Sequence, residues 1–387
     1  MNREFEQLLD KVRREGGEIR SDSREVGKGD IFVAVPGVNA DGARFIPPAV
    51  EAGASTIVCL PGGAEAEAAR AAGCTVVHHD DPREALWRLA EARWHTGSLP
   101  LRVLGVTGTN GKTTSAYLLE HLFTATGHKV GVLGTVSYRW PGHCEAAPLT
   151  TPDPLRVHAM LAAMAQAGVD IAVMEVSSHA LEQQRVCGVP FAGASFSNLT
   201  QDHLDFHHTM EEYCDAKAIL FDRCDVAIYN ADDPWHERML AHCPCRTFSY
   251  SAKGEADLSA KSIRLHAGSV DYDAEADTEW AHVHVGIPAI FTVYNTLDAI
   301  AACWNLGVPI AECADALAKN HGVKGRMEII PTPGKSFTIL NDYAHKPDAL
   351  ENVLSSVRGF AKGRTVVVFG CGGDRDRTKR PEMAQIA

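Results

Sequence analysis

The sequence contains no run of about 18 to 20 apolar residues, which is the length that a membrane helix needs. Its first residues, MNREFEQLLDKVRREGG, are charged where a signal peptide would be apolar. Basic residues are fewer than acidic ones: the chain has 37 Lys and Arg and 49 Asp and Glu, which gives a net charge of −12. We therefore expect a cytoplasmic protein that binds neither a membrane nor the extended phosphate backbone of a nucleic acid.

The sequence also lacks a framework of paired cysteines. Its eleven cysteines are an odd number and show no C-x-x-C spacing, which predicts reduced thiols rather than disulfides. Cys243 and Cys245 are the one close pair. We favour two thiols beside a proline over a metal site, because zinc-binding cysteines are usually separated by two or more residues.

The length and the apolar content predict a multidomain α/β protein. With 387 residues, of which 45% are hydrophobic, the chain can form two or three domains with separate cores. Short β-like runs alternate with alanine-rich helical patterns in residues 1–98, which predicts a small α/β domain. The runs LRVLGV, KVGVLGTV, DIAVMEV, GASFSNL and DVAIYN predict a mostly parallel sheet with helices on both faces in residues 99–324.

A third unit is expected in residues 325–387. It begins at GRMEII, and the strands predicted for SFTILNDY and RTVVVFG flank the helical pattern PDALENVLSSVRGF. One βαβ unit is a poor core by itself, so we expect this domain to be very small or incomplete at Ala387. Before it, the polar stretch HAGSVDYDAEADTEW is expected to form a surface hairpin or loop.

The stretch LGVTGTNGKTT follows an apolar run and precedes a helical pattern, which is the context of a phosphate-binding loop. Glycines in a strand-to-helix loop let a phosphate approach the backbone N–H groups and the helix N-terminus. The spacing departs from the usual pattern, because Val106 stands five positions before Gly111 and flexibility comes from Gly105 and Gly108. We predict a nucleotide site in which Lys112 contacts phosphates and the Thr113 hydroxyl binds magnesium.

Acidic and histidine residues follow other predicted strands. Glu175 ends the run DIAVMEV and could join Thr113 around magnesium, although a helix-capping cluster with Ser177 is the simpler alternative. His203 and His207 are four residues apart and allow a zinc site, but no third ligand is evident, so solvated histidines are favoured. By pattern alone, Lys217 is an ordinary surface or salt-bridged lysine.

Taken together, these motifs resemble a known family. GTNGKTT, EVSSHAL, NLTQDHLDFH, DAKAILF, VYNTLDAIAA, GRMEII, DYAHKPDAL and GCGGDRDRTKRPEM occur in the order found in the ATP-dependent Mur ligases of bacterial cell-wall synthesis. The resemblance covers nearly the whole chain. It implies a uridine-binding N-terminal domain, a central P-loop domain and a Rossmann-like C-terminal domain, which would be truncated because the family's DNPR-type signature is missing.

Within the family, the N-terminal SDSREVGKGDIFVAVPGVNADGARFI and the run GCGGDRDRTKRP are most similar to members that add diaminopimelate. The resemblance implies that ATP activates the D-glutamate γ-carboxylate of UDP-N-acetylmuramoyl-L-alanyl-D-glutamate as an acyl phosphate, which meso-diaminopimelate then attacks. The alternatives are an L-lysine-adding or another Mur-type ligase, and a non-catalytic fragment that binds UDP-sugar and ATP. We expect a monomer.

The family's functional residues can be placed on matching positions. In the family the lysine matched by Lys217 carries a carbamate formed from carbon dioxide, which would turn it into an oxygen ligand for a second Mg²⁺ ion. Leu149 and Thr292 replace asparagines that relatives often carry. The implied ATP-binding residues are Gly108, Thr109, Asn110, Gly111, Lys112, Thr113, Thr114, Asn295, Arg326, Asp342 and His345; the metal ligands are Thr113, Glu175, His203 and Lys217; the substrate-binding residues are Ser23, Val38, Asn39, Ala40, Thr150, Thr151, Ser177, Gln183, Arg185 and, for diaminopimelate, Arg375.

Overall fold

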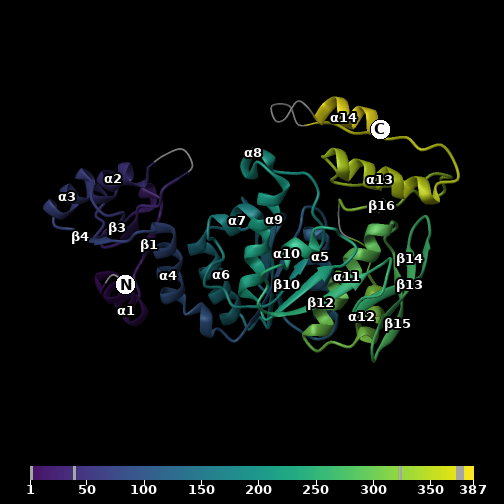
Figure 1. Ribbon diagram of the computed structural model, residues 1–387, viewed down its shortest axis with the longest axis horizontal. Helices are drawn as coiled ribbons and strands as arrows, with labels where there is room; N and C mark the ends of the chain where they lie inside the picture. Colours follow the sequence, from purple (N-terminus) through teal and green to yellow (C-terminus); the bar gives the residue numbers. More distant parts are fainter. Residues whose placement is uncertain (1–2, 38–40, 321, 323–324, 372–378) are drawn as a thin grey trace.

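The computed structural model of the chain describes residues 3–37, 41–320, 322, 325–371 and 379–387. Three units follow one another along the sequence (Figure 1). The first lies at one end of the long axis, and the third lies against one side of the central unit. Val38, Asn39, Ala40 and Arg375, which the sequence analysis assigned to substrate binding, fall outside the described residues.

The first unit is a four-stranded parallel sheet in the order β1-β2-β3-β4 with helices on both faces. The apolar side chains of the strands pack in two directions, which divides the unit into two small cores. One core lies against α1 and α4 and the other against α2 and α3. The elements are α1 (Arg3–Glu15), β1 (Ile19–Arg20), η1 (Ser23–Glu25), β2 (Ile31–Val33), η2 (Gly42–Phe45), α2 (Ile46–Glu51), β3 (Thr56–Cys59), α3 (Ala64–Ala71), β4 (Thr75–His78), α4 (Pro82–Trp94) and η3 (Thr96–Ser98).

The central unit is built on an eleven-stranded sheet in the order β15-β14-β13-β12-β11-β10-β5-β9-β6-β7-β8. The pairs from β13 through β12, β11, β10, β5 and β9 to β6 are parallel, and antiparallel hairpins extend both edges. The mostly parallel sheet expected from the sequence is therefore confirmed. The strands are β5 (Arg102–Thr107), β6 (Val130–Leu133), β7 (Ser137–Trp140), β8 (His143–Ala146), β9 (Ile171–Glu175), β10 (Phe191–Phe196), β11 (Val226–Asn230), β12 (Arg246–Ser251), β13 (Leu258–Leu265), β14 (Val270–Ala276) and β15 (Trp280–Val285).

Helices cover both faces of this sheet. α5, α11 and α12 bury their apolar residues on one face, whereas α6, α7 and α9 cover the other. Each fully buried Leu, Ile or Phe, such as Leu122 and Phe123 on α5, contributes about 1.5–3 kcal/mol of transfer free energy. The helices are α5 (Lys112–Ala125), α6 (Pro154–Gln166), α7 (Ser178–Glu182), α8 (Leu204–His207), α9 (Met210–Ala218), η4 (Ile219–Arg223), α10 (His236–Met239), α11 (Ile290–Asn305) and α12 (Ile310–Leu317).

The third unit contains β16 (Glu328–Ile330), β17 (Ile339–Asn341), α13 (Pro347–Phe360) and α14 (Lys379–Ile386). β16 and β17 form an antiparallel pair, and a small core joins α13 to α14. The expected strand at RTVVVFG, residues 364–370, is wrong, because the segment has no strand structure. Val366 and Val368 are 68% and 94% exposed there. A short apolar run forms a strand only where a neighbouring strand pairs with its backbone.

Further expectations from the sequence concern the polar stretch, the cysteines and membrane helices. The polar stretch before the third unit forms the β14–β15 hairpin, which joins the edge of the central sheet. All eleven cysteines are free, and the Sγ atoms of Cys243 and Cys245 are 3.3 Å apart. Within the described ranges, no helix has both the length and the apolar character required to cross a bilayer.

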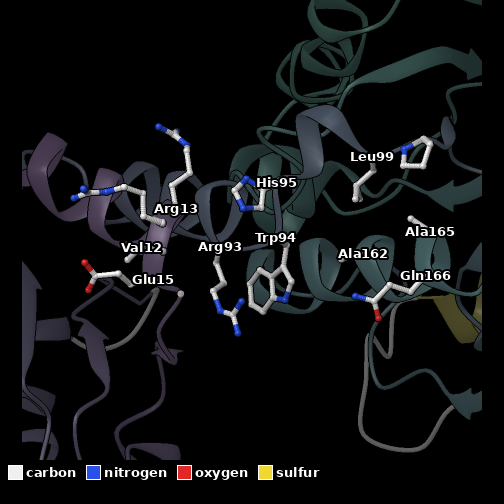
Figure 2. Close-up of a pocket in the computed structure, with 13 residues that line it drawn as sticks. Val12, Arg13, Glu15, Arg93, Trp94, His95, Leu99, Ala162, Ala165 and Gln166 are labelled. Carbon is white, nitrogen blue, oxygen red and sulfur yellow. The ribbon is translucent and has the colours of Figure 1, made fainter.

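A cavity of about 630 Å³ lies between the first and central units (Figure 2). Its walls come from the ends of α1, α4 and α6 and from Leu99 and Pro100, which precede β5. The cavity is therefore at the amino end of β5, whereas ligands of parallel α/β sheets bind at the carboxyl ends of the strands. Arg13 and Arg93 point in different directions in Figure 2, so they do not converge on a ligand.

Candidate active site

The predicted phosphate loop lies between β5 and α5 and is packed closely against the rest of the sheet. Gly108 has φ +144°, and a Cβ atom there would lie 2.1 Å from Ser197 Oγ. Gly111 has φ +91°, and its Cβ would lie 2.6 Å from Asn295 Oδ1. Only glycine fits both the backbone angles and the space. The loop leads into a 14-residue helix, whose N-terminus favours an anion.

The loop is fixed by Asn198, a residue that the sequence analysis did not select. The Thr109 N–H donates to the Asn198 carbonyl at 2.8 Å, and the Asn110 N–H donates to Asn198 Oδ1 at 3.0 Å. The Asn198 side-chain amide donates back to the Asn110 carbonyl at 3.0 Å. The loop conformation is therefore determined by the segment that follows β10, before any ligand is present.

Two lysines meet at one carbonyl group of this loop. Lys112 Nζ donates to the Gly108 carbonyl at 2.7 Å, and Lys217 Nζ donates to the same carbonyl at 3.0 Å. Lys217 is 1% exposed and lies over the ring of Tyr213, so the surface position expected from its pattern is wrong. Burial lowers the pKa of Lys112 to about 8 and, with repulsion from Lys112, the pKa of Lys217 well below its ordinary value. With a pKa near 8, Lys112 stays largely protonated near pH 7 and supplies a positive charge that suits a polyanion.

Glu175 lies at the end of β9, directly beside the start of α5. Thr113 Oγ1 donates to Glu175 Oε2 at 2.9 Å, so the structure brings together the two residues predicted to share magnesium. Thr135, which the sequence analysis missed, donates its N–H to Oε1 at 3.0 Å and its hydroxyl to Oε2 at 2.9 Å. A Cβ at Gly134 would lie 2.3 Å from Oε1, so glycine leaves room for the buried carboxylate.

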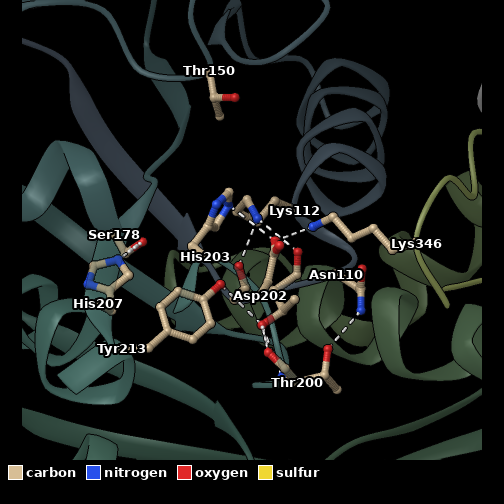
Figure 3. A network of polar contacts seen from close by, with 12 residues as sticks. Asn110, Lys112, Thr150, Ser178, Thr200, Asp202, His203, His207, Tyr213 and Lys346 are labelled. Carbon is tan, nitrogen blue, oxygen red and sulfur yellow. Dashed lines mark hydrogen bonds and ion pairs between the residues drawn. The ribbon is translucent and has the colours of Figure 1, made fainter. Parts of the chain in front are cut away.

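Asp202 and His203 follow β10 and lie near Lys112 (Figure 3). Asp202 forms an ion pair with Lys346 of the third unit, and its Oδ2 is 3.1 Å from His203 Nε2. Burial alone would raise the pKa of Asp202, but the charge and hydrogen bond of Lys346 and the contacts with His203 together outweigh it and lower that pKa. Burial lowers the pKa of His203 to about 4, so this ring is neutral near pH 7 and keeps a lone pair that can bind a cation.

The second histidine of the possible zinc pair has a different environment. His207 is 2% exposed, and its Nε2 is 2.8 Å from Ser178 Oγ, so it is not solvated as expected. Its neighbour His179 stacks on Phe206. Among the described residues, no three His, Cys, Asp or Glu side chains are grouped so that they could hold a metal ion. The geometry therefore does not support a zinc site at His203 and His207.

The residues expected to bind the substrate peptide form one connected group. Thr151 Oγ1 donates to the Glu175 carbonyl at 2.8 Å and accepts the Ser177 N–H at 3.1 Å. Arg185 donates to the Thr151 carbonyl at 3.0 Å and to Gln183 Oε1 at 2.7 Å. Thr150 lies apart from the lysines in Figure 3, with its hydroxyl 3.1 Å from that of Thr135.

A bridge connects this group to the first unit. Gln184, beside Gln183 and Arg185, accepts a hydrogen bond from Trp87 Nε1 at 3.2 Å. Its side-chain amide donates to Asp81 Oδ2 at 2.8 Å. Ser23, the remaining described substrate candidate, lies in η1 of the first unit, away from this group in the sequence.

The other nucleotide candidates are divided between two units. Asn295 on α11 faces Gly111, and Thr114 lies in the first turn of α5. Arg326 lies over the ring of Tyr343 in the third unit. His345 is exposed and contacts the Tyr343 carbonyl, while both oxygens of Asp342 accept backbone N–H groups, from Met327 and Ala344. Asp342 therefore shapes its own loop, and no contact joins it to the phosphate loop in this state.

Comparisons with known proteins agree with this arrangement. Residues 17–94 match the Mur ligase family catalytic domain, residues 106–303 the Mur ligase middle domain, and residues 325–387 the Mur ligase glutamate ligase domain. The chain belongs to the Mur ligase family. The three-unit α/β fold that the motifs implied is thus confirmed for this Mur ligase.

Two relatives and one solved structure that resemble the chain carry the same name. The chain is 42% identical over 383 residues to the UDP-N-acetylmuramoyl-L-alanyl-D-glutamate–2,6-diaminopimelate ligase of a Synechococcus strain, covering 95% of this chain and 76% of that protein. The protein of the same name from Lawsonia intracellularis is 43% identical over 380 residues, with 94% and 76% covered. A solved structure of a ligase with this name has a TM-score of 0.78 at 31% identity, covering 96% of this chain and 76% of that one.

Proposed function

We propose that this Mur ligase joins meso-diaminopimelate to the D-glutamate γ-carboxylate of UDP-N-acetylmuramoyl-L-alanyl-D-glutamate, with hydrolysis of ATP to ADP and phosphate. The observation that carries the proposal is the phosphate loop with Glu175, Lys112 and Lys217 around it, in a chain similar over most of its length to diaminopimelate ligases. These substrates belong to the cytoplasm, so we propose that location. The monomeric state stays a prediction.

ATP is proposed to bind with its phosphates on the loop from Gly108 to Thr114. Fixed glycine backbone and the N-terminus of α5 favour the phosphates, and Lys112 adds a point charge. Asn295, which lies against Gly111, is on the correct side of the loop to contact the nucleotide. Arg326, Asp342 and His345 belong to the third unit, so their proposed contacts with ATP require that unit to close further.

The residues at the loop fit a magnesium ion. Thr113 Oγ1 and Glu175 Oε2 are adjacent oxygens beside the phosphate site, and magnesium commonly takes one or two protein oxygens with phosphate oxygens and water. Lys217 as an amine donates to a carbonyl and offers no oxygen, which is the ligand atom that magnesium prefers. As a carbamate, formed when its nitrogen attacks carbon dioxide and loses a proton, it could join His203 at a second ion. When bound, magnesium would offset negative charge on the phosphates.

The chemistry follows from bringing two anions together. An oxygen of the γ-carboxylate attacks the γ-phosphorus, the bond to the ADP oxygen breaks, and an acyl phosphate forms. The amine of diaminopimelate then attacks the acyl carbon, phosphate leaves, and the nitrogen loses a proton. Lys112 lowers the electrostatic cost of the first step, while Thr151, Ser177 and Arg185 are proposed to hold the peptide beside Glu175.

The test is a competition between acceptors. The protein is incubated with UDP-N-acetylmuramoyl-L-alanyl-D-glutamate, magnesium ATP and equal amounts of meso-diaminopimelate and L-lysine, and the nucleotide products are weighed by mass spectrometry. The diaminopimelate tripeptide is expected, and Lys112→Ala should give none while unfolding like the wild type. A lysine product would assign the chain to the lysine-adding branch, and absence of any product would contradict the proposed activity.

A further inference from the structure

Lys346 connects the third unit to the nucleotide site through a buried ion pair. Its Nζ contacts Asp202 Oδ2, and the two side chains are only 17% and 7% exposed. Lys346 immediately precedes α13, whereas Asp202 follows β10 of the central unit. Figure 3 shows their side chains directed toward one another. A lysine of ordinary surface type would extend into water, so this burial indicates a defined role.

The backbone around Lys346 is held in place on the third-unit side. The Asp342 carboxylate accepts the N–H groups of Met327 and Ala344, both at 2.8 Å. The Tyr343 N–H donates to the Gly325 carbonyl at 2.8 Å. These bonds tie the segment between β17 and α13 to the start of the unit. Lys346 therefore moves together with the third unit.

On the other side, Asp202 is shared with His203. Its Oδ2 atom, which pairs with Lys346, is also 3.1 Å from His203 Nε2. His203 has φ +55°, a left-handed conformation that non-glycine residues adopt only when their surroundings hold them there. Lys346, Asp202 and His203 therefore form a continuous polar chain from the third unit to a residue beside the phosphate loop.

We propose that Lys346 is a positioning residue that docks the third unit on the nucleotide site and, through Asp202, fixes the ring of His203. This inference rests on the proposed ligase function. Because Lys346 Nζ is directed at Asp202 rather than at the loop, its loss should leave nucleotide binding largely intact. The steps that need both units together, transfer of the phosphoryl group and attack by the amine, should slow.

The first experiment compares Lys346→Met, Lys346→Arg and the wild type for product formation and for the dissociation constant of magnesium ATP. Lys346→Met should lower kcat by roughly tenfold or more, because it leaves the Asp202 charge buried without its partner. The dissociation constant should change by less than about threefold. Lys346→Arg should recover part of kcat, and Lys362→Met, at an exposed lysine just after α13, should match the wild type.

A double-mutant cycle separates a linked pair from two unrelated effects. If Lys346 acts through Asp202, adding Lys346→Met to Asp202→Asn should lower kcat by less than about twofold more, because the interaction is already lost. If the kcat losses of the two single variants multiply in the double variant, the inference is overturned. A normal kcat in Lys346→Met would overturn it as well. Thermal unfolding of each variant checks that the fold persists.

A measurement independent of turnover distinguishes failure of this inference from failure of the proposed function. Amide hydrogen exchange in residues 342–350 and 198–206 should become faster in Lys346→Met and stay unchanged in Lys362→Met. If the wild type forms no ligation product but this pattern appears, the docking role stands and the proposed reaction fails. Unchanged exchange in both segments would refute the docking role.

Discussion

The phosphate loop and the third unit are held in place in different ways. At the loop, Gly108 and Gly111 press against Ser197 and Asn295, and buried side chains surround the backbone. In the third unit, α13 and α14 share a core of a few residues, and Val368 is almost fully exposed. The loop is therefore shaped before any ligand binds, whereas the third unit depends on polar contacts such as that of Lys346. We therefore expect closure of the units to complete the site.

The largest expected difference between the two regions comes from adding one methyl group to a glycine. Gly108→Ala places Cβ against Ser197 Oγ and forces a left-handed φ, which should cost about 2–3 kcal/mol of folding free energy. It should also weaken magnesium ATP binding by tenfold or more, because the loop must shift. Calorimetric titration and denaturant unfolding measure both effects.

The matched control lies in the third unit. At Gly363 a Cβ would meet nothing within 4 Å, and its φ is outside the left-handed range. Gly363→Ala should therefore change the free energy of unfolding by less than about 1 kcal/mol, in the stabilising direction if at all. Equal changes in the free energy of unfolding at Gly108 and Gly363 would contradict the proposal that the loop is rigid and the third unit loosely held.

The free energy of unfolding should depend on pH through a histidine where the first and central units meet, and this effect is of intermediate size. His158 is fully buried; its Nδ1 is 2.6 Å from Thr96 Oγ1 and its Nε2 is 3.0 Å from the Cys187 carbonyl. Burial lowers the pKa of His158 to about 4. Because the folded pKa lies below that of the unfolded chain, this contribution is complete above pH 6.5 and decreases as the pH falls towards 4.

The measurement compares the wild type with His158→Gln by denaturant unfolding at pH 7.5 and pH 5. The wild type should lose about 2 kcal/mol more than the variant over this interval, since a glutamine does not bind the proton. Acid also lowers the free energy of unfolding through other titratable groups, but those groups are the same in both proteins. Equal losses would mean that His158 is not held neutral in the folded protein.

The sequence predicted the local parts of the fold and of the site. An apolar run, glycines and a helical pattern were sufficient for β5, the loop and α5, and Glu175 was placed at a strand end by the same reasoning. These features depend on neighbours in the sequence. The burial of Lys217 was not visible, because a polar residue in a helix gives no sign of which helix face the sheet covers.

Contacts between distant segments were missed for a related reason. Thr135 follows β6 after Gly134, and a threonine after the glycine at a strand end was the signal that could have indicated it. Asp202 and Lys346 are 144 residues apart, and no local pattern connects them. The incorrect strand at residues 364–370 shows the same limit, because strand formation depends on a partner that the segment's own pattern does not supply.

The smallest expected effect comes from that segment. Val368 is 94% exposed, so Val368→Thr exchanges a methyl for a hydroxyl that water can solvate, and the free energy of unfolding should change by less than about 0.5 kcal/mol. The same change at Val173, fully buried in β9, should cost about 1–3 kcal/mol because the hydroxyl loses water. Denaturant unfolding of both variants tests the pair. A cost at Val368 comparable to that at Val173 would mean that the segment is covered in solution, and the third unit would then be packed as firmly as the central sheet.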